Sequence, residues 1–459
     1  MKDAAFYFAQ FSAETSYEDL PEKVVLKIKN ILSDALACIL AGANNPNTVR
    51  AGRLFCEMGG KAEAGAFAAK RKLPAMNAAL VNAVAGTCLD YNDLNEPAHT
   101  HIGISCVPAA LAVAESLGTR VCGKDIICSL AVGMEIGCRL GLAAIKRYEK
   151  HVMGGWVYCS VHASISSAVV ASKLMGLSAQ ETRNAIGIAY HQAAGNGLAA
   201  FDGTDVRVFG AGFAARNGIL AAMLAQIGVT GTQNSIDSDE LSLMNLYHNG
   251  AKAGVLLEKL GSDYHLLDTG FKAYPCCGLG HRQLDAVSEL IKENSIAAEN
   301  IIEIKLSVPL LVYKQLVHSD KPVPPSNMSQ AQFDLRWQTA CMALYGKLGL
   351  SEFQASRLAE PDILEMMKKV HIEAEETLSD ETIPAEVSIE STLGIFCKKT
   401  EDRYGSPQKP FSADRLREKM LECAGYGQQL TKEDALELCE CISVLEYPDA
   451  AARMFKLLG

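Results

Sequence analysis

The sequence predicts a mainly α-helical protein, with a large all-α domain and a smaller α+β lid domain. Apolar residues recur at helical spacing through most of the chain, whereas strict alternation of apolar and polar residues is confined to residues 266–395. Proline also becomes more frequent in that region. We therefore expect a helical domain over 1–265, the lid over 266–395, and a helical return over 396–459. The return should pack back on the first domain, because three short helices make a poor core of their own.

Helix ends in the first domain are marked by capping residues. Pro21 precedes an apolar stripe, and Pro108 is expected in the first turn of a helix that stops at Gly118. Ser178-Ala-Gln-Glu181 is a capping box that opens another helix. Residues 125–142 and 214–227 continue the helical pattern. Alanine and glycine are abundant throughout, so these helices can pack closely.

The lid domain carries the strand patterns. Residues 302–308 (IEIKLSV) alternate strictly, and the segments that begin at Val370 and Val387 do the same, which predicts half-buried strands of one open sheet. Helices are expected over 281–293, 332–346 and 361–369. In the C-terminal return, a second capping box begins at Thr431.

Composition excludes several function classes. The 459 residues carry 43 basic and 53 acidic side chains, and a net charge of −10 argues against a partner such as duplex nucleic acid. The long apolar stretch 104–114 ends at a glutamate and is shorter than the roughly 18 residues of a membrane span, so we expect no membrane association. The acidic N-terminus lacks the apolar region of a secretory signal, which predicts a cytoplasmic protein. The fifteen scattered cysteines contain no C-x-x-C pair and are expected to be reduced.

Two short motifs have a structural and a functional interpretation. Gly210-x-Gly212-x-x-Ala215 matches a dinucleotide-binding fingerprint, but the preceding segment is short and carries an arginine, so close helix packing is favoured. His99 and His101 could be two metal ligands, yet no third ligand has convincing spacing. We therefore expect neither a metal nor an organic cofactor.

A richer group of polar residues lies just before the helix that contains Pro108. Asp90, Asp93, His99 and His101 crowd one loop, and catalytic residues are often held on loops by a rigid scaffold. A carboxylate beside an imidazole can fix its tautomer and tune its pKa, which suits proton transfer. The alternative is a polar loop whose aspartates only cap helices.

Four segments carry a resemblance to a known family. They are LDYNDL with the later VPAALAVAE, RVFGAGFAARNGILAAMLAQIGVTG, FKAYPCCGLGHRQLDA and QAQFDLRWQTACMAL. In this order, and over nearly the whole chain, they resemble the MmgE/PrpD family. Known activities in that family are 2-methylcitrate dehydratase, cis-aconitate decarboxylase and iminodisuccinate epimerase.

The resemblance implies roles for individual residues. Asp90 matches the catalytic-loop aspartate, His101 an active-site histidine and His281 a second one. Arg207 falls where relatives usually have a substrate-binding lysine, and Lys272 matches the lysine of the F-K-x-Y-P-C-C segment. We expect Asp90, His101 and His281 to be catalytic, and Arg207, Lys272, His318 and Asp93 to bind substrate.

Several positions depart from the family pattern. Asn92 stands where a second aspartate is common, and Leu94 replaces a usual threonine. Val157 takes the place of an active-site histidine, and His318 that of a tyrosine found in the decarboxylases. These changes leave the reaction open. We favour a 2-methylcitrate dehydratase-like lyase, with an epimerase of an imino- or amino-dicarboxylate, or a cis-aconitate decarboxylase-like enzyme, as alternatives.

The reactions of the family share the movement of a proton, or the loss of a carboxylate, next to a carboxylate or carbonyl group. The charge that develops needs cations preset around it, and Arg207, Lys272 and Arg282 are the candidates, the last being the most readily explained as a salt-bridged surface charge. His101 and His281 are the best acid/base pair and lie in different predicted domains, so a cleft between domains is expected to hold the small polycarboxylate substrate. The resemblance also implies a homodimer.

Overall fold

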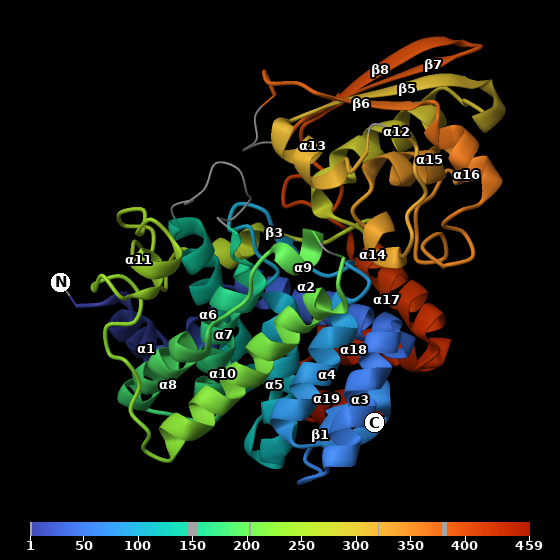
Figure 1. The fold of residues 1–459 in the computed structure, drawn as a ribbon. Coiled ribbons are helices and arrows are strands. Elements are labelled where there is room, and N and C mark those ends of the chain that lie inside the picture. The colour runs from blue at the N-terminus through green and yellow to red at the C-terminus, as the bar shows by residue number, and fades with distance from the viewer. Residues whose placement is uncertain (1, 145–154, 202, 320, 379–382) are drawn as a thin grey trace. The chain divides into compact units, whose positions relative to one another are not determined.

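The computed structural model describes residues 2–144, 155–201, 203–319, 321–378 and 383–459 (Figure 1). The chain divides into two compact units, of which one is Met1–Gly270 with Ser412–Gly459 and the other is Phe271–Phe411. The first unit is helical, and the second combines helices with a sheet. The mainly α fold with a smaller α+β part is therefore confirmed. The predicted boundary at residue 395 falls inside a strand, and the smaller unit extends to Phe411.

The larger unit consists mainly of helices. Their bounds are α1 Ala4–Glu14, α2 Glu22–Ala41, α3 Pro46–Met58, α4 Ala75–Thr87, α5 Gly103–Leu117, α6 Gly123–Ala143, α7 Tyr158–Leu174, α8 Ala179–Gln192, α9 Leu198–Phe201, α10 Gly210–Gln226, α11 Leu243–Tyr247, α17 Ala413–Gly427, α18 Lys432–Ser443 and α19 Ala450–Leu458. Two short antiparallel pairs also occur, β1 (Ala64–Ala66) with β2 (Arg71–Leu73) and β3 (Leu94–Asn95) with β4 (Thr269–Gly270). The sequence did not predict these two pairs, because strands of two or three residues carry no periodicity to detect.

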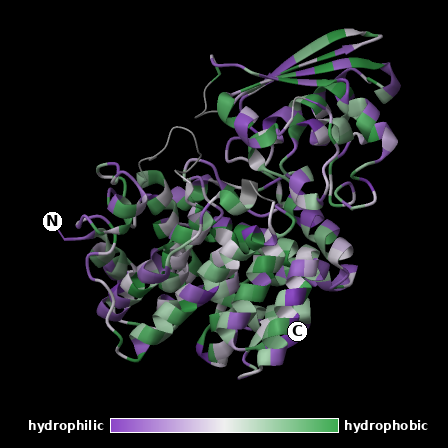
Figure 2. Cartoon of the chain, viewed as in Figure 1, coloured by the Kyte–Doolittle hydropathy of each residue, from purple (hydrophilic) through white to green (hydrophobic). Residues whose placement is uncertain are grey.

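Helices α4, α5, α6, α7 and α10 pack against one another and form the core of this unit. Small residues allow their close approach. A Cβ atom on Gly133 of α6 would lie 2.3 Å from Val170 Cγ2, and one on Gly218 of α10 would lie 2.4 Å from Ser167 Cβ. Figure 2 shows the apolar colouring of these helices. By length and hydropathy α6 could cross a membrane, as could Asp205–Gln226, but the apolar window of α6 is 94% buried as a core helix.

Capping residues set helix ends as predicted at Ser178, whose side chain accepts from the Glu181 amide while Glu181 accepts from the Ser178 amide. The helix expected from Pro108 instead begins at Gly103, so that Pro108 lies inside α5. Proline there removes one intrahelical hydrogen bond, which the buried helix tolerates. Residues before Gly210 form the 3-10 helix η6 (Asp205–Phe209) rather than a strand, which excludes the dinucleotide fingerprint.

The smaller unit contains one four-stranded sheet. Its bounds are β5 Ile301–Val308, β6 Val370–Ala374, β7 Ala385–Ser391 and β8 Gly394–Thr400, with helices α12 His281–Glu293, α13 Leu310–Leu316, α14 Met328–Ala331, α15 Leu335–Tyr345 and α16 Pro361–Met367. The strand order is β6-β5-β7-β8, with β5 and β6 parallel and the other pairs antiparallel. Helices α12 and α15 pack on the sheet (Figure 1). The three predicted strands are confirmed. Strand β8 was missed because it is an edge strand whose apolar Ile395 is 68% exposed.

The C-terminal return begins at Ser412 and not at residue 396. From there it belongs to the larger unit, where α17 packs against α2 and is followed by α18 and α19. The two helices approach closely at Gly427, where a Cβ atom would lie 1.8 Å from the carbonyl oxygen of Leu40. The side-chain Nδ2 of Asn44 donates to the Gly427 carbonyl at 2.8 Å. Only glycine therefore lets the end of α17 reach this position on α2.

Replacing Gly427 with alanine is expected to lower the free energy of unfolding by about 3 kcal/mol, because the methyl group overlaps the main chain of α2. Gly425→Ala is the matched control on the same helix, since a Cβ there meets nothing within 4 Å. It should raise stability by about 1 kcal/mol through helix propensity. Urea unfolding of both variants measures the difference. Equal effects would contradict the proposed close approach.

Candidate active site

The loop between α4 and α5 holds most of the residues that the sequence singled out. Asp90 has a left-handed backbone (φ 50°) and its amide donates to the Thr87 carbonyl, which turns the chain away from α4. Asp93 is only 1% exposed, and its Oδ2 accepts from the Gly103 amide at 2.9 Å. A carboxylate at the start of a helix satisfies an amide that has no partner within the helix. Asp93 therefore connects the loop to the first turn of α5.

A second anchor of this loop is Asn95, which is 1% exposed. Its Nδ2 donates to the His265 carbonyl at 3.0 Å and its Oδ1 accepts from the Ala98 amide at 3.1 Å. The pairing of β3 with β4 holds the same position through the main chain. The loop is therefore fixed on both sides of Asp93.

His101 is oriented by the main chain. Its Nδ1 lies 2.5 Å from the carbonyl oxygen of Asp93, and a carbonyl can only accept, so Nδ1 carries the hydrogen. In the neutral ring, Nε2 is then the nitrogen that can take up a proton. The Asp93 carbonyl therefore fixes this tautomer at Nδ1, and orientation of the ring by the Asp90 carboxylate stays a prediction. Backbone geometry of this kind leaves no signal in a sequence.

Asp90 faces a cation. Its Oδ1 lies 3.7 Å from Nη1 of Arg207, and the two side chains are 10% and 13% exposed. Arg207 belongs to η6, whose first residue, Asp205, accepts from Asn47 and Arg50 at 3.0 Å. The structure thus brings Asp90 and Arg207 together from distant parts of the chain, as the predicted site requires.

Cys159 is a neighbour of Arg207, Asp93 and Asp90 that the sequence analysis did not identify. Burial raises the pKa of its thiol to about 11, Arg207 acts in the opposite direction, and Asp93 and Asp90 add to the rise. The thiol therefore lies within electrostatic reach of all three groups. Since Cys159 is the second residue of α7, the N-terminal end of that helix, next to Val157, belongs to the same region.

The pKa of Asp93 is raised to about 7, chiefly by burial and next by the nearby Asp34 carboxylate, although its hydrogen bonds act to lower it. Its carboxyl group thus changes charge near neutral pH. The predicted role of Asp93 in substrate binding stays a prediction, and the contact with Gly103 gives it a structural role as well.

The remaining predicted residues belong to the smaller unit. His281 is the first residue of α12 and is fully buried, with Nε2 donating to the Cys276 carbonyl at 3.2 Å. Lys272 is 1% exposed and follows Phe271, whose carbonyl accepts from Arg403 at 2.6 Å. The predicted catalytic role of His281 and the substrate-binding role of Lys272 stay predictions.

Two other candidates differ in their surroundings. Arg282 is 6% exposed and donates from Nε to the Glu401 carbonyl at 2.6 Å, so it is a buried residue with a main-chain contact and not the surface charge that was expected. His318 lies exposed after α13, where its charge partly offsets the burial that raises the pKa of Asp334. The substrate-binding role of His318 stays a prediction.

Within the residues that the structure describes, no group of three or more His, Cys, Asp and Glu side chains could hold a metal ion. His99 has a left-handed backbone (φ 49°) and its amide donates to the Glu96 carbonyl. This turn separates the paired residues Asn95 and Thr100.

Comparison with known proteins identifies the family. The MmgE/PrpD N-terminal domain matches residues 7–254, and the MmgE/PrpD C-terminal domain matches residues 274–443. The chain belongs to the MmgE/PrpD family. The resemblance stated from four segments is therefore confirmed, and the loop with Asp90 and His101 lies in its N-terminal domain.

Relatives of this MmgE/PrpD protein include decarboxylases. The chain is 27% identical over 436 residues to the cis-aconitate decarboxylase-like protein oryM of Aspergillus oryzae, covering 90% of this chain and 88% of that one. It is 24% identical over 437 residues to a cis-aconitate decarboxylase of Aspergillus terreus, with the same coverage. The Homo sapiens cis-aconitate decarboxylase is 29% identical over 389 residues, covering 82% of this chain and 77% of its own.

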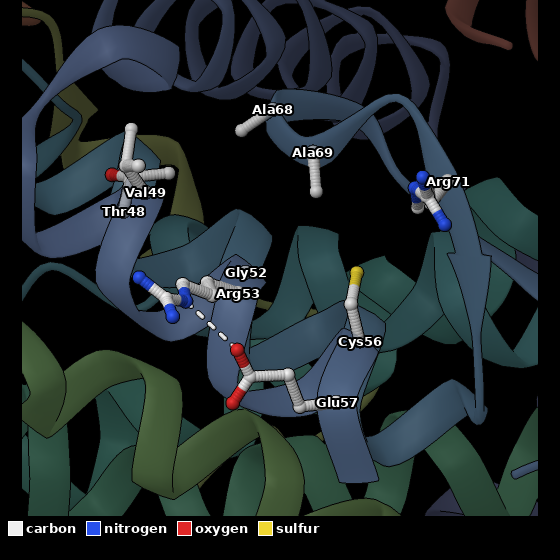
Figure 3. Close-up of a pocket in the computed structure, with 9 residues that line it drawn as sticks. All are labelled: Thr48, Val49, Gly52, Arg53, Cys56, Glu57, Ala68, Ala69 and Arg71. Atoms are coloured by element: carbon white, nitrogen blue, oxygen red, sulfur yellow. Dashed lines mark hydrogen bonds and ion pairs between the residues drawn. The ribbon is translucent and has the colours of Figure 1, made fainter. Parts of the chain in front are cut away.

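A surface groove in this MmgE/PrpD protein lies apart from the predicted residues (Figure 3). It is lined by Thr48, Val49, Gly52, Arg53, Cys56, Glu57, Ala68, Ala69 and Arg71. Arg53 is paired with Glu57 at 2.8 Å, one turn along α3. The groove contains none of the predicted catalytic or substrate-binding residues.

Two buried histidines that the sequence did not single out form a pair. The Nε2 atoms of His162 on α7 and His248 lie 3.0 Å apart, and the Tyr158 ring packs 4.5 Å from that of His162. One ring must donate and the other accept, so the two rings cannot both be protonated. Burial lowers the pKa of His248 to about 4, and burial together with His248 lowers that of His162 well below its usual range.

This pair should make stability depend on pH. The unfolded chain binds a proton at His248 from about pH 6.5 downward, whereas the folded protein binds it only near pH 4. The free energy of unfolding should therefore fall as pH drops through this window, by about 3 kcal/mol for His248.

Urea midpoints measured between pH 4 and 7.5 test this expectation, with His248→Gln giving a flatter profile than the parent protein. His371→Gln is the control, because His371 on β6 has a side chain that is 52% exposed. It should leave the profile unchanged. An equally steep profile in His248→Gln would contradict the assignment.

Proposed function

We propose that this protein is a lyase that acts on a small di- or tricarboxylate by proton transfer next to a carboxylate group, as a 2-methylcitrate dehydratase-like hydro-lyase. One observation carries the proposal. Nδ1 of His101 is hydrogen-bonded to the main chain, which leaves Nε2 as the basic nitrogen, and Asp90 of the same loop is paired with Arg207. A base and a cation in one loop region are what such a reaction requires.

Arg207 is proposed to bind a substrate carboxylate. A guanidinium can hold a carboxylate through two parallel hydrogen bonds, which fixes its direction better than an ammonium does. Asp90 keeps the guanidinium in place. The N-terminal end of α7, beside Cys159, adds a favourable dipole for a negative group.

His101 Nε2 is proposed to take the proton from the carbon next to the carboxylate. The electron pair of the broken C–H bond forms the double bond, and the hydroxyl group on the adjacent carbon leaves with a proton as water. The bond from Nδ1 to the Asp93 carbonyl stabilises the imidazolium that forms. His281 is proposed as the acid that protonates the leaving group, on the strength of the family resemblance.

Decarboxylation is the second candidate, favoured by the cis-aconitate decarboxylases among the relatives. There the bond to a carboxyl carbon breaks, carbon dioxide leaves, and the electron pair left on carbon accepts a proton from His101 in its protonated form. The same cation stabilises the charge in both reactions.

Incubation with a panel of small di- and tricarboxylates in deuterated buffer tests the proposed function. Formation of an alkene with loss of water, followed by mass and ultraviolet absorbance, is the expected result. Release of carbon dioxide would assign a decarboxylase, and deuterium exchange without a new double bond would assign an epimerase. No exchange and no product with any member of the panel would overturn the proposal.

Replacing His101 with glutamine should lower turnover by about 10²–10⁴ because the base is lost. The variant should keep its melting temperature, because glutamine retains an amide that can donate to the loop carbonyl that Nδ1 contacts. Steady-state kinetics and circular dichroism measure both properties. A folded variant with near-normal turnover would eliminate the mechanism.

Arg207→Ala separates binding from proton transfer in the same assay. It should raise KM for the substrate, and it should lower kcat only as far as the cation stabilises charge in the transition state.

His281→Gln tests the proposed acid that protonates the leaving group. If it keeps full turnover while folded, His281 has no role in catalysis.

A further inference from the structure

Lys419 on α17 is a fully buried ammonium group. Its Nζ donates to Asp34 Oδ1 at 2.6 Å and to the carbonyl oxygen of Tyr91 at 2.7 Å, and it lies 3.8 Å from the centre of the Tyr91 ring. Neither the Lys419 nor the Asp34 side chain is exposed to solvent. Burial lowers the pKa of Lys419, but Asp34 and its other neighbours outweigh that effect and hold the pKa above its ordinary value, so the lysine stays charged.

Tyr91 lies between Asp90 and Asp93 in the site loop, which we define as residues 88–103. It follows Asp90, which pairs with Arg207, and precedes by two residues Asp93, whose carbonyl holds His101. A second residue of α17, Arg415, donates to the Tyr91 hydroxyl at 3.3 Å. The C-terminal return therefore contacts the site loop between its two functional groups.

A buried ion pair is by itself weak evidence for a gain in stability, because desolvation offsets most of the attraction. Such a pair is useful where it fixes one arrangement of the chain. The buried pair of Arg139 with Glu135 gives a comparison, since Arg139 donates to the carbonyls of Val255, Glu258 and Asp263 and so holds a different loop. In each case the cation satisfies the carbonyls of one particular loop.

We propose that Lys419 is a positioning residue of the active site, which holds the Tyr91 carbonyl and thereby keeps the Asp93 carbonyl in place for the bond to His101 Nδ1. The inference rests on the proposed function in so far as it concerns catalysis. The effect of Lys419 on the His101 tautomer can be measured whether or not the proposed reaction takes place. Asp34 provides the countercharge that makes a buried ammonium tolerable at this point.

Two double variants isolate the hydrogen bond from the charges. Lys419→Met with Asp34→Asn removes both charges and the donor, whereas Lys419→Gln with Asp34→Asn removes the charges but keeps an amide that can donate to the Tyr91 carbonyl. Asp3→Asn is a stability control, because Asp3 is a buried carboxylate that accepts from the amides of Ile236 and Asp237 far from the site loop in sequence.

The readouts are the ring nitrogen signals of His101 in protein labelled with ¹⁵N-histidine, assigned with His101→Gln, and the kinetic constants. In the Met variant we expect the pure Nδ1–H tautomer to become a mixture and kcat to fall about 10- to 100-fold, with a smaller change in KM. The Gln variant should retain the tautomer and most of kcat. Asp3→Asn should lower the melting temperature and change neither readout.

An unchanged tautomer and kcat in a folded Met variant would overturn the proposal, as would equal losses in the Met and Gln variants. If the proposed reaction is absent from the parent protein, the tautomer still decides this inference. If the Met variant does not fold, native-state hydrogen exchange of the parent protein decides it. The amides of Asp90 and Gly103 should then open together with α17, and opening of the loop while α17 stays protected would overturn the proposal.

Discussion

The loop between α4 and α5 contains several buried polar residues, and they constrain much of the larger unit. Asn92, Asp93, Asn95 and Thr100 are each at most 2% exposed. Buried polar groups need hydrogen-bond partners, because each one left without a partner costs about 1–3 kcal/mol. The partners come from the start of α5, from the segment around residue 265, and from the C-terminal return. Three regions distant in sequence are thereby required to meet at one loop.

Small residues make that meeting possible. Close contacts at Gly133, Gly218 and Gly427 leave no room for a Cβ atom, so helices approach nearly backbone to backbone. Such packing brings main-chain carbonyls within reach of side chains on neighbouring helices. The buried ammonium of Lys419 uses this proximity, since α17 must lie against α2 before its side chain can reach both Asp34 and the Tyr91 carbonyl.

The electrostatics of the loop follow from burial more than from net charge. Burial, and next the nearby Asp34 carboxylate, raise the pKa of Asp93 to about 7, while Asp90, next to Arg207, faces a cation. Two aspartates three residues apart therefore have different surroundings: one is placed to hold a guanidinium, and the other holds the main chain. The His162–His248 pair shows a third outcome, in which burial keeps both imidazoles neutral.

The sequence by itself determined the helical character of the large domain, three of the four strands of the smaller sheet, the capping box at Ser178 and the family, because each depends on short-range periodicity or on a contiguous motif. It also identified Asp90, His101 and Arg207 as candidate site residues. Only the tertiary structure decided that the Asp93 carbonyl orients His101, and that Cys159, Asp34 and Lys419 lie near this loop. A carbonyl oxygen is present in every residue, and a contact between residues 91 and 419 depends on how helices pack. No spacing along the chain encodes either of them.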